Sequence, residues 1–168
     1  MPSSIISQEF IAFVDNHRKL IYKVCRMYCR NDALVKDVEQ EILAQLWIAF
    51  PKYDNSTKPS TWIYRIALNT AISCYRRERK HSARQSDIDQ SVFLMAEEHE
   101  SDDTEEQIRR LYAFIEQFAE LDRALLMLYL DENSYEDIAV VLGITVTNVA
   151  TKISRLKQKL KKLMTDNQ

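Results

Sequence analysis

A stretch near the C-terminal end of the chain carries basic and hydroxyl side chains at helical spacing. Between Thr145 and Lys162 there are six basic residues and no acidic one. Apolar residues recur at intervals of three and four from Val146 to Leu163, which predicts an amphipathic helix. Its opposite face carries Thr147, Thr151, Ser154, Arg155, Gln158 and Lys162. Such a face can contact phosphates and read base edges, although a solvated lysine face shows the same pattern.

The only glycine of the chain, Gly143, lies directly before this helix. Glycine adopts positive φ without steric cost, so it is expected where the backbone must turn sharply. Upstream, Ser134 and Asp137 form a near capping box before a run of apolar residues, and Thr145 can cap the helix that follows. Two helices joined by a glycine turn predict a helix-turn-helix, whose second helix can enter the major groove of DNA.

A second group of residues, in the middle of the chain, combines aromatic and basic side chains. Its members are Trp62, Tyr64, Arg65, Asn69, Thr70, Tyr75, Arg76, Arg77, Arg79 and Lys80. Aromatic rings stack on unpaired bases and arginines follow the phosphate backbone, so this pattern is typical of contact with a melted strand. Trp62 fits a core position equally well, because one aromatic residue at helical spacing is usually buried.

A third face is acidic. Asp37, Gln40, Glu41 and Gln45 lie opposite the apolar residues of a predicted helix. Carboxylates repel DNA, so this face indicates a basic protein partner, with a solvated surface as the alternative.

The elements that position these groups are all expected to be helices. The chain has one Gly and three Pro in 168 residues and few alternating β-branched runs, which favours an all-α fold. We expect one helix over residues 5–30 and a second from Asn31-Asp32 to Pro51, with Leu34, Val38, Ile42, Leu46 and Trp47 facing inward. Residues 52–59 form a loop, Ser60 caps a third helix, and helices resume near Thr104 or Ile108 with a break at residues 131–133.

Charge divides the chain into two small helical domains. The formal net charge is only −2, but residues 85–107 hold nine acidic residues and no basic one. Such a block is typical of a flexible linker. We therefore expect domains at residues 1–84 and 108–168, joined by an acidic linker at 85–107.

Several classes of protein find no support in the sequence. It contains no nucleophile elbow, phosphate-binding loop or metal-ligand pattern, so we expect no enzyme activity and no cofactor. Cys25, Cys29 and Cys74 fit reduced thiols better than a zinc site. Because the chain shows neither a membrane span nor a signal peptide, a cytoplasmic location is expected.

Three segments together resemble a known family. They are Asp37–Trp47, Trp62–Ile72 and Ser134–Thr145, and in this order they are similar to bacterial RNA polymerase sigma factors. With only two domains, the chain resembles the extracytoplasmic-function (ECF) group. The likeness extends over nearly the whole chain except the linker.

This resemblance implies roles for individual residues. A polymerase-binding face, which docks on the clamp coiled coil, would comprise Asp37, Gln40, Glu41 and Trp47. Residues that open and read the −10 promoter element would be Lys52, Asn55, Ser56, Trp62, Arg65, Asn69, Arg76 and Arg77. Residues at the −35 element would be Tyr135, Thr147, Thr151, Lys152, Ser154 and Arg155. The resemblance also implies binding to the polymerase flap, a linker that enters the RNA path, and an anti-sigma partner.

The sequence departs from the family pattern at three places. Lys58–Thr61 replaces a segment that often holds an aromatic residue, Ala150 stands where Lys or Arg is common, and Asp122 stands where many relatives have Pro. The promoter sequence therefore cannot be deduced. Two other classes remain as alternatives: a dimeric helix-turn-helix repressor and an all-helical adaptor. Neither needs the acidic face of Asp37 and Glu41 followed by an aromatic-basic helix.

Overall fold

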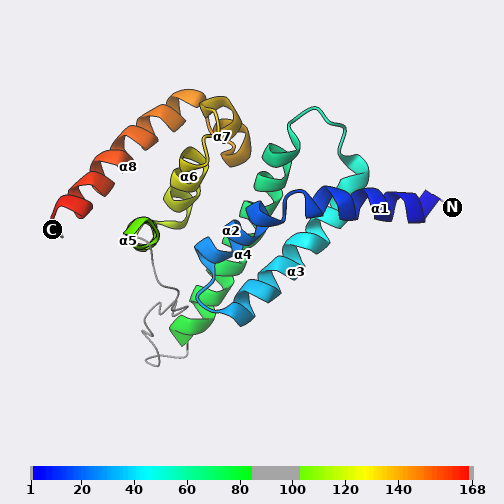
Figure 1. Ribbon diagram of the computed structural model, residues 1–168, viewed down its shortest axis with the longest axis horizontal. Coiled ribbons are helices and arrows are strands. Elements are labelled where there is room, and N and C mark those ends of the chain that lie inside the picture. The colour runs from blue at the N-terminus through cyan, green and yellow to red at the C-terminus, as the bar shows by residue number, and fades with distance from the viewer. Residues whose placement is uncertain (1, 85–102, 167–168) are drawn as a thin grey trace. The chain divides into compact units, whose positions relative to one another are not determined.

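The structure is a computed structural model that describes residues 2–84 and 103–166 (Figure 1). Within these ranges every regular element is a helix, which confirms the predicted all-α class. Contacts divide the chain into two compact units, residues 1–86 and 87–168. Most of the predicted linker, residues 85–102, lies outside the described residues.

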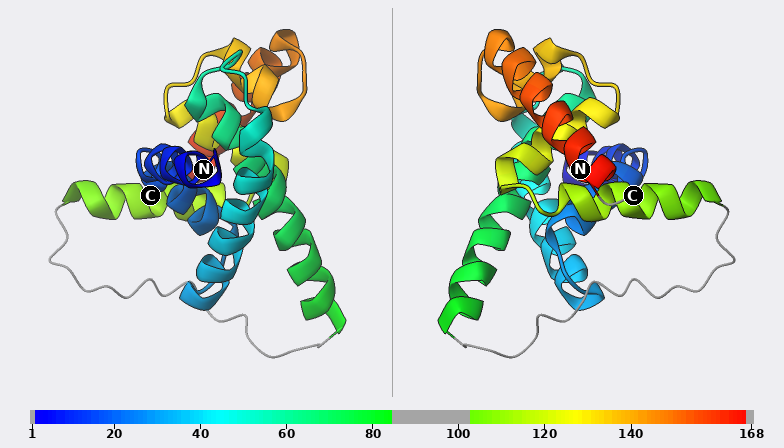
Figure 2. Two further views of the ribbon diagram at one scale, coloured as in Figure 1. Left: turned by 90° about the vertical axis from the view of Figure 1, so that its right-hand side faces the viewer. Right: turned by 90° about the vertical axis from the view of Figure 1, so that its left-hand side faces the viewer.

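The first unit contains four α-helices and one short 3₁₀-helix. These are α1 (Pro2–Asp15), α2 (Arg18–Tyr28), α3 (Asp32–Ala49), η1 (Phe50–Lys52) and α4 (Pro59–Arg84). The helices α2, α3 and α4 pack against one another in pairs (Figure 2). Their shared core is fully buried and includes Ile21, Val24, Ile42, Leu46, Ile63 and Ala67. Burial of these apolar side chains supplies the main stabilisation of the unit.

The single helix expected over residues 5–30 is wrong, because the chain breaks at Asn16 and His17. The N–H of His17 donates to the carbonyl of Val14 at 2.9 Å, a tight closing turn, and its ring Nδ1 lies 2.7 Å from the Phe13 carbonyl oxygen. These contacts supply hydrogen-bond partners to backbone carbonyl groups that have none within the helix at its C-terminal end. Apolar spacing continues across the break, so periodicity alone could not reveal it.

The ends of α3 follow the prediction, whereas the exposure of Trp47 and the start of α4 do not. Asn31 caps the helix by accepting a hydrogen bond from the Leu34 N–H at 2.9 Å, and Pro51 follows its end. Trp47, expected to face inward, is 44% exposed. Helix α4 begins at Pro59 rather than after a Ser60 cap, because proline suits the first helical position, where no N–H is needed.

The second unit contains α5 (Asp103–Ile115), α6 (Glu120–Leu130), α7 (Tyr135–Leu142) and α8 (Val146–Asp166). Its core is formed by Ile115, Leu125, Leu128, Ile138, Val149, Ile153 and Leu156. Helix α5 takes in residues 103–107, which we had expected in the linker. Acidic residues stabilise a helix N-terminus, and Arg110 pairs with Glu106 at 3.4 Å along the same helix.

The helix-turn-helix has the predicted turn and caps. Gly143 adopts φ 68° and ψ 34°, and its N–H donates to the Ala139 carbonyl at 2.8 Å. The hydroxyls of Ser134 and Thr145 accept from the N–H groups of Asp137 and Asn148, both at 3.1 Å. One detail differs, since Val146, expected inward, is 41% exposed at the first turn of α8.

No single described helix is long and apolar enough to cross a membrane. The pair α7 and α8 meets the length and composition criteria only when joined, and it is bent by 101° at the turn. That angle falls in the range of helix-turn-helix motifs.

Gly143→Ala should lower the free energy of unfolding by about 1 kcal/mol, because an L side chain at positive φ is strained. A Cβ at this position would meet no atom within 4 Å, so the loss would come from the backbone alone. Gly143→Asn is the matched control and should lose less, since Asn tolerates this conformation. Urea unfolding followed by circular dichroism, with hydrogen exchange of the α7 and α8 amides, measures the difference. Equal stability of the Ala variant and the parent would contradict it.

Candidate functional site

The polar face of α8 is exposed along its whole length. Thr147, Thr151 and Ser154 follow one line at intervals of four and three residues, and Lys152 and Arg155 lie beside that line, all exposed. The Thr151 hydroxyl donates to the Thr147 carbonyl at 3.0 Å, which fixes its orientation. These five side chains lie opposite the buried residues of the helix, as predicted.

Tyr135, the sixth residue of the predicted −35 set, lies on α7, whereas the other five lie on α8. It is half-buried in the first turn of α7, with its ring centroid 6.5 Å from that of Tyr129. The Lys157 ammonium lies 4.5 Å from the centre of the Tyr129 ring. A hydrogen bond to Tyr129 raises the pKa of Lys157 above its usual value. Lys157 therefore belongs to the side of α8 that faces α6.

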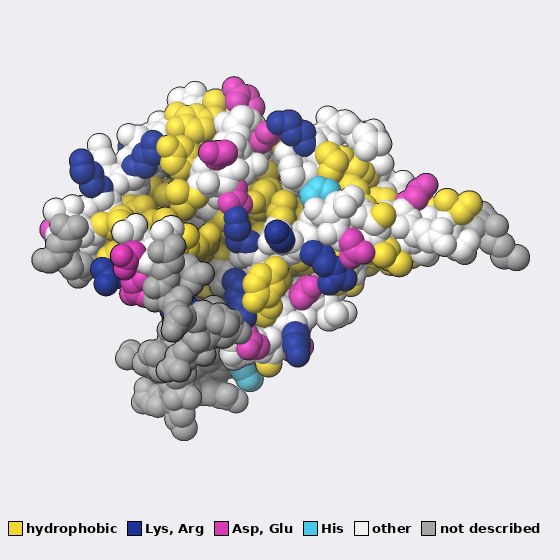
Figure 3. Space-filling view, viewed as in Figure 1, with side chains coloured by type: hydrophobic (Ala, Val, Ile, Leu, Met, Phe, Trp, Pro, Cys, Tyr) yellow, Lys and Arg dark blue, Asp and Glu magenta, His cyan; other side chains and the backbone are white. Residues whose placement is uncertain are grey.

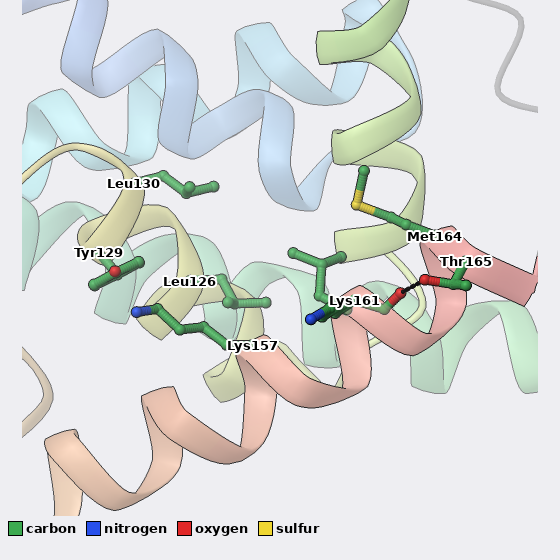
Figure 4. Close-up of a pocket in the computed structure, with 8 residues that line it drawn as sticks. Leu126, Tyr129, Leu130, Lys157, Lys161, Met164 and Thr165 are labelled. Carbon is green, nitrogen blue, oxygen red and sulfur yellow. Dashed lines mark hydrogen bonds between the residues drawn. The ribbon is translucent and has the colours of Figure 1, made fainter.

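Beside these residues lies an apolar groove that sequence reasoning missed. It has a volume of about 350 Å³ and is lined by Leu126, Tyr129, Leu130, Lys157, Leu160, Lys161, Met164 and Thr165 (Figure 4). Apolar side chains gather over the region between α6 and α8 in the space-filling view (Figure 3). Leu130 and Met164 are each 42% exposed. Their exposure could not be predicted from the sequence, because both residues lie at helix ends, where only packing decides whether a neighbouring helix covers them.

The loop between η1 and α4 is held by internal hydrogen bonds. The Tyr53 hydroxyl donates to the Thr57 carbonyl at 2.7 Å, and the Asp54 carboxylate accepts from the Ser56 N–H at 3.0 Å. The bonds from Ser56 lower the pKa of Asp54. Asn55, at the tip, has φ 61°, a conformation that Asn tolerates better than most residues. Asn55 and Ser56 are exposed, so their polar atoms face solvent.

Trp62 anchors this loop to the first unit. Its ring centroid lies 4.6 Å from that of Tyr53 and 5.7 Å from that of Phe13. The side chain is half-buried, so one part of the ring packs against the unit and another part is accessible. Tyr53 and Phe13 were not singled out from the sequence, because their aromatic partners are distant along the chain.

Three of the predicted −10 contacts on α4, Arg65, Asn69 and Arg76, lie on one exposed stripe. Ser73 and Lys80, which were not in that set, complete the stripe, whose members follow at intervals of three or four residues. Arg77 is also exposed, on the neighbouring line. Lys52 is exposed in η1, before the loop. The stripe therefore begins near Trp62 and continues toward the C-terminal end of the helix.

The acidic face of α3 is exposed and has an apolar end. Asp37 and Glu41 are one turn apart, and Gln40 is in line with Trp47, seven residues later. Ile48, which we did not predict, continues the line of Asp37 and Glu41 and is 68% exposed. An apolar residue at the end of a charged stripe is a common feature of protein interfaces.

Comparison with known proteins identifies both units. Residues 13–81 match the family model for sigma-70 region 2, and residues 108–160 match that for sigma-70 region 4. The ECF RNA polymerase sigma factor SigW of Bacillus subtilis (strain 168) is 26% identical over 94% of this chain and 89% of that protein. SigM of the same organism is 26% identical over 85% of this chain and 87% of that protein.

Solved structures share the fold. The chain is similar to CnrH in its complex with the cytosolic domain of CnrY, with a TM-score of 0.70, 20% identity, and coverage of 96% of this chain and 91% of that chain. It is also similar to the sigma factor RpoE of Bartonella quintana in complex with the anti-sigma factor NepR. There the TM-score is 0.72 at 18% identity, with coverage of 96% and 98%.

Two helical units of this kind, one ending in a helix-turn-helix, define a DNA-binding transcription initiation factor of the sigma-70 family. The chain belongs to the ECF group of RNA polymerase sigma factors. It therefore acts in promoter-specific initiation of transcription, and the repressor and adaptor alternatives are set aside.

Trp62→Ala should lower the free energy of unfolding by about 2 kcal/mol, because it removes ring contacts with Phe13 and Tyr53. Trp47→Ala is the matched control and should lose less than about 1 kcal/mol, since Trp47 is 44% exposed. Urea unfolding followed by circular dichroism compares the two. If both variants lose the same free energy of unfolding, Trp62 does not hold the loop to the first unit.

Proposed function

We propose that each of the two units recognises a different promoter element. Residues 1–84 dock on core RNA polymerase and read the −10 element, residues 108–168 read the −35 element, and residues 85–107 connect them. The chain acts without catalysis of its own, as a dissociable subunit in the cytoplasm. The match of both sigma-70 regions in one chain, in this order, carries the proposal.

The docking surface is the exposed line of Asp37, Gln40 and Glu41 with Trp47 at its end. Carboxylates on a helix attract a basic helix or coiled coil, and the exposed indole adds apolar contact area. The clamp coiled coil of the polymerase is the partner that the family resemblance implies. The apolar surface of the second unit is the proposed binding surface for the polymerase flap.

Run-off transcription with core polymerase, with and without this protein, tests the function as a whole. We expect promoter-specific transcripts only when both are present. Binding of a symmetric duplex site by the protein alone, as a dimer, would instead favour a repressor.

Asp37→Lys with Glu41→Lys should weaken binding to core polymerase by at least tenfold, because charge reversal across a docked pair typically costs several kcal/mol. The control is Glu9→Lys with Asp166→Lys, an equal change of charge at two exposed positions elsewhere. Affinity for labelled core polymerase is measured for both variants, after circular dichroism has checked helicity. Undiminished binding by the first variant would remove this face from the interface.

Arg155→Ala should weaken binding to a cognate −35 element by about 1–3 kcal/mol, as expected for loss of a bidentate contact with a base. Lys162→Ala should weaken binding equally for all sequences and reduce the salt slope by about one, because it contacts phosphate alone. Titration of holoenzyme with matched and mutated elements at several salt concentrations separates the two effects. Normal transcription by the Arg155 variant from a promoter that depends on its −35 element would exclude the base contact.

Asn55→Ala with Asn69→Ala should prevent holoenzyme from opening duplex promoters, because capture of an extruded base offsets the few kcal/mol that flipping costs. A template with a pre-melted −10 bubble should restore part of the activity, whereas Arg76→Ala should weaken both templates through lost phosphate contact. Permanganate footprinting of thymines measures melting. Full melting of the duplex by the double variant would exclude the loop from the mechanism.

We also infer an anti-sigma partner. The two similar solved structures are sigma factors bound to CnrY and to NepR, and those partners belong to those proteins. An equivalent protein for this chain would cover the same surfaces that polymerase and DNA need. Release of promoter activity on deletion of such a partner, in the cells that produce it, would test the inference.

A further inference from the structure

The outer face of α2 is strongly basic, and it is not part of the surfaces proposed for polymerase or promoter DNA. Residues 16–31 include no acidic residue and five basic ones, which are Arg18, Lys19, Lys23, Arg26 and Arg30. At about 100° per residue, Arg18, Tyr22 and Arg26 follow one line of the helix, with Lys19 and Lys23 on the line beside it. The opposite side is buried and includes Ile21, Val24, Cys25 and Tyr28. The basic face therefore lies on a helix that the core holds in place.

Tyr22 lies in the middle of this face, and its side chain is 47% exposed. The Arg26 Nε donates a hydrogen bond to the Tyr22 hydroxyl at 2.7 Å, and the guanidinium carbon lies 5.2 Å from the ring centroid. Arg26 is itself held by Asp32, whose carboxylate lies 2.7 Å from the Arg26 Nη2. The exposed ring is therefore fixed among cations, and it has little freedom left to lose when a ligand binds.

The acidic neighbours of α2 do not cancel its charge. Asp15 pairs with Arg18 at 2.8 Å. The hydrogen bond and the charge of Asp15, and more weakly the charge of Glu39 on α3, raise the pKa of Arg18. With Asp32, three carboxylates lie close to five basic residues. Lys19 is exposed and takes no part in these ion pairs, so the face remains positive.

The start of α2 places this positive charge where a helix tolerates it least. Arg18 and Lys19 are the first two residues of the helix, its first turn holds no acidic residue, and His17 makes no side-chain cap. The N-terminal end of a helix carries partial positive charge, which attracts anions and repels basic side chains. Local rules of this kind are broken mainly at functional surfaces, so the arrangement indicates an anionic partner.

We propose that the basic face of α2, which comprises Arg18, Lys19, Tyr22, Lys23 and Arg26, binds single-stranded DNA. The cations would contact phosphates, and the Tyr22 ring would stack on an unpaired base. An acidic protein would match the cations but needs no exposed ring among them, and a duplex keeps its bases stacked on one another. This surface is additional to the −10 contacts proposed on α4 and does not depend on them.

Anisotropy of a labelled oligo-dT strand, titrated with the full chain at several salt concentrations, tests the phosphate contacts. Lys19→Gln with Lys23→Gln should weaken binding roughly five- to tenfold at low salt. The salt slope should fall by about 1.4, because each phosphate contact on a single strand contributes about 0.7. The matched control is Lys36→Gln with Arg109→Gln, an equal change of charge at exposed positions on α3 and α5, which should keep the slope of the parent. Circular dichroism checks the helicity of each variant.

Stacking by Tyr22 has its own readout. Tyr22→Leu should weaken binding to oligo-dT at least fivefold, because it removes the contact between ring and base. Binding to an abasic strand of the same length should stay unchanged, since that strand offers phosphates alone. Tyr22→Phe keeps the ring and should bind like the parent. An equal effect of Tyr22→Leu on both strands, or no effect on either, excludes the stacking role.

Other outcomes overturn the proposal as a whole. No binding of oligo-dT by the parent chain, or an unchanged salt slope in the double lysine variant, excludes a phosphate-binding face on α2. An equal loss of affinity for a duplex of the same length would show a general attraction of phosphates instead of a single-strand surface. If a polyglutamate peptide binds the parent more tightly than oligo-dT and loses that affinity in the same variant, α2 fits an acidic protein.

Discussion

The ring of Phe13 is the point at which the helices and the loop on one side of the first unit are held together. It lies within 5.2–5.7 Å of the rings of His17, Phe50, Tyr53 and Trp62, measured between centroids. Through these contacts α1, η1, the following loop and α4 are fixed to one another. The loop itself has few apolar residues and its hydrogen bonds are internal, so this aromatic cluster is what attaches it to the neighbouring helices.

Acidic and basic side chains are separated along this small chain. The net charge of −2 arises because an acidic block offsets basic stretches on α4 and α8. On α3 the exposed residues Asp37 and Glu41 are acidic, whereas no acidic residue occurs on α8 before Asp166. Separation of this kind lets one face attract a basic protein while another attracts phosphate, and both attractions weaken with salt.

Local rules explain which parts of the fold could be predicted. Ser134, Gly143 and Thr145 act through their own backbone neighbours, so their sequence positions were sufficient to place the helix-turn-helix. The break at Asn16 and His17 was missed because apolar spacing runs through it. Trp47 was placed inward by the same spacing, yet nothing else in its unit covers the indole fully. Sites that depend on packing between distant segments, such as the apolar groove between α6 and α8, had no signal in the sequence.

Helix α4 has 26 residues, and its exposed stripe from Arg65 to Lys80 spans about 22 Å at 1.5 Å per residue. This is roughly six or seven base-pair steps at 3.4 Å. The helix therefore fixes how far apart the two ends of the stripe lie, and in which direction the side chains at each end point. A single inserted residue would rotate everything beyond it by about 100°. An insertion would therefore change the position and direction of every exposed side chain beyond it, whereas a substitution changes only one.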